Sequence, residues 1–135
     1  MLYVTRRETF NSAHRVFNAE LSDEENLKLF GNCSNPNWHG HNYVLEVVVA
    51  GEINPVTGYV VDLKILKKII IENVIEKVDH KNLNLEVEFM KNIQPSAENI
   101  AVQIWKQLEN KIPEGRLFSV KLYETENNYF EYKGE

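Results

Sequence analysis

Alternating apolar and polar residues predict strands near both ends of the chain. In residues 2–12, Val4 and Phe10 share one face, whereas Thr5 and Thr9 lie on the other. Such alternation is typical of a strand with one buried face, because successive side chains of a strand point to opposite sides. The same pattern predicts further strands at residues 39–49, 117–124 and 129–133.

Apolar residues at intervals of three and four predict two helices between the second and third strands. The first follows Asp62, a good capping residue, and its apolar stripe extends over residues 63–78. The second opens at Ser96 and carries its stripe through Leu108. The polar segment 20–28 is compatible with either a helix or a loop, so it is left open.

The resulting order of elements is ββααββ over a single domain, residues 1–135. We therefore expect an α+β fold, in which an antiparallel four-stranded sheet carries two helices on one face. The outer edges of such a sheet expose unpaired backbone groups, which can pair with another copy of the chain. Association between copies is therefore expected from the strand pattern alone.

Composition indicates a globular protein and argues against nucleic-acid binding, membrane insertion and secretion. Of the 135 residues, 43% are hydrophobic and 26% are charged, which is ordinary for a domain with a core. The net charge of -5, with no basic block, argues against general nucleic-acid binding. No segment approaches the roughly 20 apolar residues of a membrane helix, and the charged N-terminus is unlike a signal peptide. A single cysteine cannot form an internal disulfide, so we expect a cytoplasmic protein.

Two histidines separated by one residue are the sharpest chemical feature. His39 and His41 share one face of the second predicted strand, because side chains repeat every second residue. His14 continues the face of Phe10 on the first strand, although only this alternation links it to the pair. Three imidazoles are the ligand number of a catalytic zinc, which keeps its fourth position open for water or substrate. The sequence thus predicts a zinc site at His14, His39 and His41.

The only cysteine, Cys33, lies six residues before His39 in a turn rich in Asn and Gly. One interpretation is an incidental small residue. The other is a thiolate whose pKa is lowered by a nearby zinc or imidazolium, so that it acts as a base or nucleophile. The residues alone leave both open.

Asp79 and His80 end the first predicted helix. A histidine at a helix C-terminus interacts favourably with the helix dipole, which is a purely structural explanation. Alternatively, Asp79 orients His80, which then transfers protons near neutral pH. The sequence does not decide between these two interpretations.

Glu124 continues the apolar face of the strand 117–124, where a carboxylate needs a partner if it is buried. A solvated strand end is the simpler interpretation and the one that the spacing favours. The alternative is a buried anchor that accepts hydrogen bonds from an N–H-rich heterocycle.

Five segments together resemble the 6-pyruvoyltetrahydropterin synthase family, in order over nearly the whole chain. They are residues 10–15, 31–43, 78–83, 96–99 and 123–128. The resemblance implies the tunnelling fold, in which copies join edge to edge into an oligomeric barrel, usually a homohexamer built from two trimers. It also implies that the site lies between subunits, so that a monomer is inactive.

The resemblance further implies roles for the candidate residues. His14, His39 and His41 bind Zn²⁺, Cys33 is the catalytic thiol, Asp79 and His80 assist proton transfer, and Glu124 and Ser96 bind the pterin ring. The implied substrate is 7,8-dihydroneopterin triphosphate, which loses triphosphate without an external reductant. Cations must hold the triphosphate, with Mg²⁺ as a possible aid; the candidates by neighbourhood are Arg6, Arg7, Arg15 and Lys81.

Two positions depart from the family pattern: Trp38 stands where members often have Gly, and Ala97 where many have Thr. Two other functions stay open. The queuosine-pathway 6-carboxytetrahydropterin synthase shares the substrate, zinc and catalytic groups but releases acetaldehyde; the step from Cys33 to His39 resembles the pyruvoyl enzymes more. A non-catalytic zinc-binding assembly protein with the same fold is the third possibility.

Overall fold

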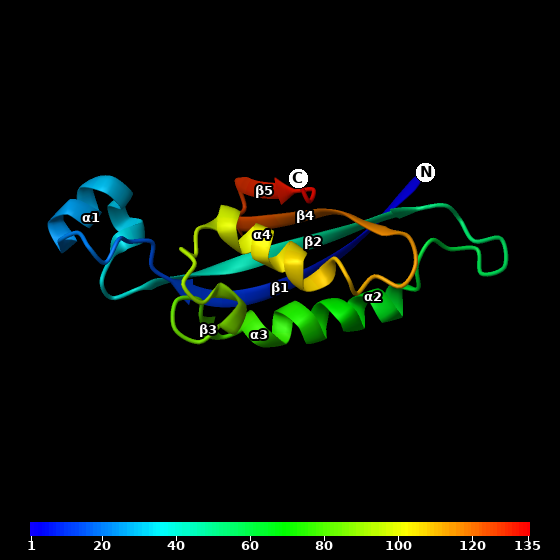
Figure 1. Ribbon diagram of the computed structural model, residues 1–135, viewed down its shortest axis with the longest axis horizontal. Coiled ribbons are helices and arrows are strands. Elements are labelled where there is room, and N and C mark those ends of the chain that lie inside the picture. Colours follow the sequence, from blue (N-terminus) through cyan, green and yellow to red (C-terminus); the bar gives the residue numbers. More distant parts are fainter.

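A computed structural model describes all residues, 1–135, and contains one five-stranded sheet in the order β3-β1-β2-β4-β5 (Figure 1). The strands are β1 (Leu2–His14), β2 (His39–Gly51), β3 (Lys81–Asn82), β4 (Arg116–Thr125) and β5 (Asn128–Tyr132). The α-helices are α1 (Asp23–Phe30), α2 (Leu63–Ile70), α3 (Glu76–Val78) and α4 (Ala97–Leu108). Short 3₁₀ helices lie at Gly31–Ser34 and Glu88–Met90, and a π-helical turn lies at Ile71–Ile75.

The α+β class is confirmed, but the expectation of a purely antiparallel four-stranded sheet is wrong. The four predicted strands do pair antiparallel, β1 with β2, β2 with β4 and β4 with β5. The fifth strand, β3, pairs parallel to β1, with Lys81 opposite Ser12 and Asn82 opposite Ala13. Two residues are too few to produce a visible alternation, so sequence patterning could not identify this strand.

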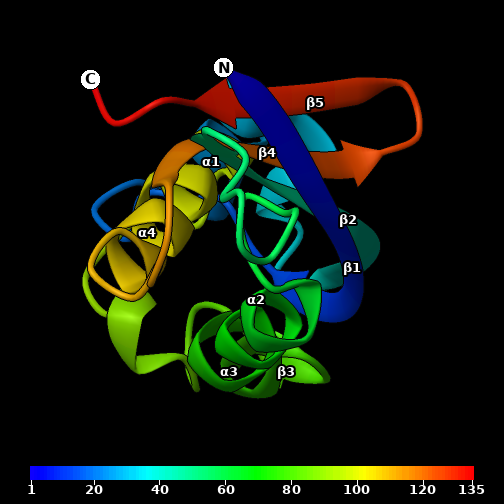
Figure 2. The same cartoon turned by 90° about the vertical axis from the view of Figure 1, so that its right-hand side faces the viewer.

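Helices α2, α3 and α4 cover the same face of the sheet, as the end-on view in Figure 2 shows. The core lies between these helices and the inward side chains of β1, β2 and β4, and its buried members include Leu45, Leu66, Ile104 and Leu122. None of the helices combines the length and the apolar character that crossing a membrane requires.

Two local elements differ from a simple helix prediction. The predicted helix over residues 63–78 is continuous but passes through the π-helical turn, where the Asn73 side chain donates a hydrogen bond to the Ile69 carbonyl. The open segment 20–28 contains helix α1, which Ser22 and Glu25 begin with a reciprocal capping box. The capping box therefore explains where helix α1 begins.

Gly115 precedes β4 at a position that only glycine fits. Its φ is +72°, and an added Cβ would lie 2.7 Å from the Ala50 carbonyl oxygen. We expect Gly115→Ala to lower the free energy of unfolding by about 2–4 kcal/mol, because strain and a backbone clash add. Urea unfolding would measure this loss.

Gly58→Ala is the matched control, since Gly58 has φ +81° but nothing within 4 Å of an added Cβ. It should cost only about 1 kcal/mol, the strain of the left-handed backbone alone. Equal losses in the two variants would contradict the clash at Gly115.

Candidate active site

Strand register brings the three histidines together. β1 and β2 pair so that His14 lies directly opposite His39, and His41 lies opposite Ser12. All three side chains point to the face that the helices cover, because the alternation of both strands is unbroken to this end. One ligand atom from each ring lies within 4.8 Å of the others, so the three histidines lie together and could hold a metal ion.

Hydrogen bonding leaves one nitrogen of each ring free to bind a metal. The Nδ1 atom of His14 lies 2.7 Å from the Pro95 carbonyl oxygen. Because a carbonyl only accepts, Nδ1 carries the proton and Nε2 keeps its lone pair. That Nε2, His39 Nδ1 and His41 Nε2 are buried without any hydrogen-bond partner.

Three unpartnered imidazole nitrogens on neighbouring side chains fit a divalent metal. Buried polar atoms are normally hydrogen-bonded, so three orphans that face one another need an explanation. An imidazole set suits zinc, and three protein ligands leave a coordination position open for substrate. The donor set is thus compatible with a divalent metal such as zinc.

Burial also favours the neutral form of His14 and His39. It lowers the pKa of His14 from 6.5 to about 4, even though the bond to Pro95 acts in the opposite direction, and it lowers the pKa of His39 too. Neutral imidazole is the form that binds metal, so burial favours the metal-binding form of these two residues.

The low pKa of His14 predicts how the stability of the metal-free protein depends on pH. Between pH 6.5 and about 4, the unfolded chain binds a proton at His14 that the folded chain excludes. The free energy of unfolding should therefore fall as the pH drops through this window, by up to about 3 kcal/mol. Urea unfolding of chelator-treated protein at several pH values measures the slope. His14→Gln should flatten it, and an unchanged slope would contradict the assignment.

Glu124 lies beside the histidines, so the favoured interpretation of a solvated strand end is wrong. β4 continues through Thr125, and the Glu124 side chain is only 24% exposed. Its carboxylate oxygens lie 3.8 Å from His14 Nε2 and 3.9 Å from His41 Nε2. A carboxylate here can accept hydrogen bonds from a ligand held at the cluster.

Cys33 is an exposed residue in the 3₁₀ helix that follows α1. Its carbonyl accepts a hydrogen bond from the Val16 amide at 2.8 Å, and the Arg15 guanidinium donates to the next carbonyl, Ser34, at 2.7 Å. Arg15 also contacts Asp23 at 3.1 Å. The segment that carries the thiol is therefore fastened to the end of β1, next to His14.

Asp79 and His80 form a pair at the outer edge of the sheet. The His80 Nδ1 atom lies 3.0 Å from an Asp79 carboxylate oxygen. The Asn11 amide donates a hydrogen bond to Asp79 at 2.9 Å. This bond is the main cause that lowers the pKa of Asp79, and the contact with His80 lowers it further. No hydrogen bond or ion pair joins the two residues to Cys33 or to the histidine cluster, and the His80 side chain is 82% exposed.

Ser96 caps helix α4, since its hydroxyl accepts a hydrogen bond from the Asn99 amide. Ser96 directly follows Pro95, whose carbonyl holds His14. Ala97 begins the helix and is buried. The hydroxyl proton of Ser96 remains available to a ligand, whereas Ala97 offers only its backbone.

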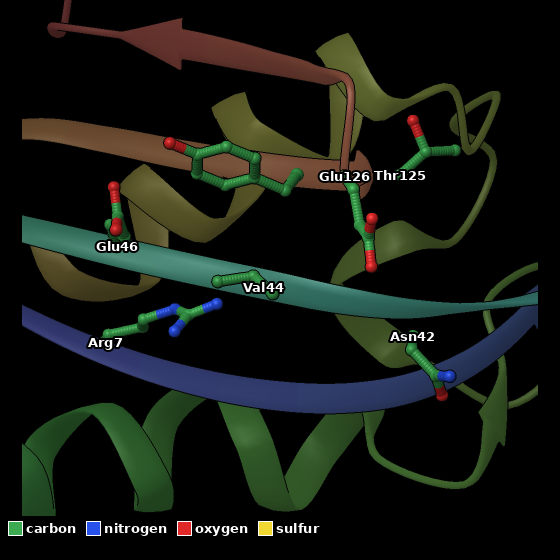
Figure 3. A pocket seen from close by; sticks show the side chains of 7 residues that line it. Arg7, Asn42, Val44, Glu46, Thr125 and Glu126 are labelled. Atoms are coloured by element: carbon green, nitrogen blue, oxygen red, sulfur yellow. The ribbon is translucent and has the colours of Figure 1, made fainter.

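The candidate phosphate-binding cations are dispersed. Arg7 lines a pocket on the face of the sheet away from the helices, with Asn42 and Glu46 (Figure 3). Arg6 pairs with Glu8 at 2.7 Å, and Arg15 contacts the Ser34 carbonyl and the Asp23 carboxylate. Of the four candidates, Arg6 and Arg15 form ion pairs, whereas Arg7 and Lys81, which lies on β3 next to His80, do not.

Trp38 has a strained backbone immediately before His39. Its φ is +68°, a region that bulky residues rarely occupy and that costs about 1–2 kcal/mol. Glycine would adopt this conformation without this strain.

Tyr43 is a site residue that sequence reasoning missed. It follows His41 on the inward face of β2, and its ring centroid lies 5.6 Å from that of His41. Its place in the apolar alternation of the strand predicts only a core residue. The tertiary structure shows in addition that its buried hydroxyl lacks a hydrogen-bond partner.

Known proteins resemble the chain over its whole length. A family profile described as 6-pyruvoyl tetrahydropterin synthase matches residues 3–135. The 6-pyruvoyl tetrahydrobiopterin synthases of Pongo abelii and Homo sapiens are 52% and 51% identical, each over 98% of this chain and 91% of the relative. The solved structure of Caenorhabditis elegans 6-pyruvoyl tetrahydropterin synthase superposes with a TM-score of 0.91 at 41% identity, covering 99% of this chain and 96% of the other.

A relative with a different product is more distant. The 6-carboxy-5,6,7,8-tetrahydropterin synthase of Rickettsia felis is 30% identical over 97% of this chain and 99% of its own length. The full-length profile match, the identities above 50% and the histidine cluster agree with one another. The chain belongs to the 6-pyruvoyl tetrahydropterin synthase family.

Proposed function

We propose that the chain is a zinc-dependent 6-pyruvoyltetrahydropterin synthase, which eliminates triphosphate from 7,8-dihydroneopterin triphosphate. The observation that carries the proposal is the set of three unpartnered imidazole nitrogens on a chain whose full-length relatives at 51–52% identity bear this name. Non-catalytic zinc binding is less favoured, because Cys33 and the Asp79–His80 pair are all present.

His14, His39 and His41 would hold the zinc. When bound, zinc supplies a Lewis acid that makes side-chain hydroxyls of the substrate more acidic. The Pro95 carbonyl orients His14 by accepting its Nδ1 proton, which directs Nε2 toward the ligand. Glu124 is suited to accept hydrogen bonds from the amino and ring N–H groups of the pterin, and Ser96 to donate one.

Cys33 would take protons from the substrate side chain as a thiolate, and His80, oriented by Asp79, would return them. Loss of triphosphate and tautomerisation leave one side-chain carbonyl. A second tautomerisation forms the other carbonyl while the ring gains the two hydrogens of the tetrahydro state. The oxidation of the side chain thus balances the reduction of the ring, and no external reductant is needed.

The Asp79–His80 pair would act in the site of a neighbouring copy. Both residues lie at a sheet edge, and the exposed His80 makes no contact with the histidine cluster of its own chain. β3 covers β1 only at Ser12 and Ala13, so most of the outer edge of β1 remains unpaired, as does the outer edge of β5. Pairing of these edges would give the barrel of the tunnelling fold, with a hexamer of two trimers as the expected assembly.

A product assay tests the proposal. Zinc-loaded protein is incubated with 7,8-dihydroneopterin triphosphate and Mg²⁺, and triphosphate, acetaldehyde and the pterin product are measured. We expect triphosphate without acetaldehyde, and a pterin that keeps its three side-chain carbons. Stoichiometric acetaldehyde with a 6-carboxy pterin would instead support the queuosine-pathway activity, and no product from fully metal-loaded protein would support a non-catalytic role.

A further inference from the structure

The Tyr43 hydroxyl is a buried polar group without a partner. Tyr43 is 0% exposed, and its ring stacks on Phe10 with a centroid separation of 4.8 Å. No backbone or side-chain atom forms a hydrogen bond with its hydroxyl. The ring is therefore held firmly in the core while its polar end is unsatisfied.

The ring that carries this hydroxyl lies beside the histidine cluster. The ring centroid is 5.6 Å from that of His41 and 6.2 Å from that of His14. A phenol hydroxyl is ordinarily protonated at neutral pH, so this hydroxyl is available as a hydrogen-bond donor.

Folding alone does not explain this hydroxyl. A buried polar group without a partner costs about 1–3 kcal/mol, and phenylalanine would make the same ring contacts without that cost. An orphan donor whose ring lies beside the histidine cluster is best explained by a ligand oxygen that accepts from it.

We propose that Tyr43 is a further catalytic residue, whose hydroxyl donates a hydrogen bond to a side-chain oxygen of the pterin substrate as that oxygen becomes negatively charged. This inference rests on the proposed function. As the side-chain hydroxyl loses its proton on the way to a carbonyl, its oxygen gains negative charge, and a fixed donor in a water-poor site stabilises that charge. Tyr43 keeps its own proton throughout, so no bond to it breaks.

The test is Tyr43→Phe, with Tyr123→Phe as the matched control. Tyr123 pairs with Val44 and lines the pocket on the opposite face of the sheet. Tyr43→Phe should not lower the urea midpoint of the ligand-free protein, because it removes no hydrogen bond. Its kcat should fall at least about tenfold, with bound zinc unchanged. Tyr123→Phe should leave kcat unchanged.

Two non-reacting pterins locate the contact. Neopterin carries side-chain oxygens, whereas 6-methylpterin lacks them and reports ring binding alone. We expect Tyr43→Phe to weaken neopterin binding about 3- to 10-fold and to leave 6-methylpterin binding unchanged.

A lower urea midpoint with unchanged binding of both pterins would overturn the proposal, since the hydroxyl would then be structural. Equal weakening of both pterins would also overturn it, because the contact would be to the ring. Failure of the proposed function is distinguishable, since acetaldehyde release by the parent protein would reject the pyruvoyl activity without changing the comparison of the two pterins.

Discussion

Replacement of His41 by alanine is expected to abolish metal binding and to reduce turnover by roughly 10³-fold or more. His41 supplies one of only three protein nitrogens in the cluster, and no fourth histidine lies near enough to replace it. A two-nitrogen site would bind zinc far more weakly, and the substrate hydroxyls would lose the Lewis acid that acidifies them. Metal content by elemental analysis and steady-state kinetics on the same samples measure both effects.

His80→Ala is the matched control for that experiment. His80 is an exposed histidine at the sheet edge, outside the cluster. Its alanine variant should keep about one zinc per chain while losing activity, because it removes a proton donor and no ligand. Loss of zinc from the His80 variant, or full zinc in the His41 variant, would contradict the ligand assignment.

Co-expression of Cys33→Ala with His80→Ala is expected to restore activity that neither variant has alone. Each single variant should lose at least about 10²-fold in kcat, because each removes one proton-transfer group. If the thiol of one copy works with the pair of its neighbour, mixed oligomers contain some sites in which both groups are intact. Random mixing makes that about a quarter of the sites.

Differently tagged chains allow the mixed oligomers to be purified and assayed per bound zinc. The control is co-expression of Cys33→Ala with His41→Ala. His41 and Cys33 serve the same cluster in one chain, so each mixed site lacks either thiol or metal and activity should stay low. Absence of recovery in the first pair, with mixed oligomers demonstrated, would place Cys33 and His80 in one chain and reject the shared site.

Much of the fold follows from local sequence patterns. Alternation located the four long strands, and the same parity placed His39 and His41 on one inward face. Helix α1 could also have been assigned, because Ser22 and Glu25 have the spacing of a capping box. These features depend on residues close in sequence, which is why a single sequence reveals them.

Other features depend on contacts between distant segments. The pairing of His14 with His39 is a matter of register, which no local pattern specifies. The two-residue strand β3 forms because the chain leaving α3 passes along β1, where His80 donates its amide proton to the Asn11 carbonyl. Glu124 and Tyr43 gain their significance only from the histidines that β1 and β2 bring to them.

His14 and His39 lie at the end of the paired strands β1 and β2, which affects how firmly these strand ends are held together. These residues form the last pair of the ladder, where the two strands separate into the long connection that contains α1 and Cys33. Terminal ladder pairs fray most easily, so an ion bound by both strands would act as a cross-link at the weakest point of the hairpin. Metal occupancy would then slow hydrogen exchange at the strand ends and keep the connection folded against the sheet. A bound ion would thus act on the substrate and would also keep the ends of β1 and β2 together, next to the connection that carries Cys33.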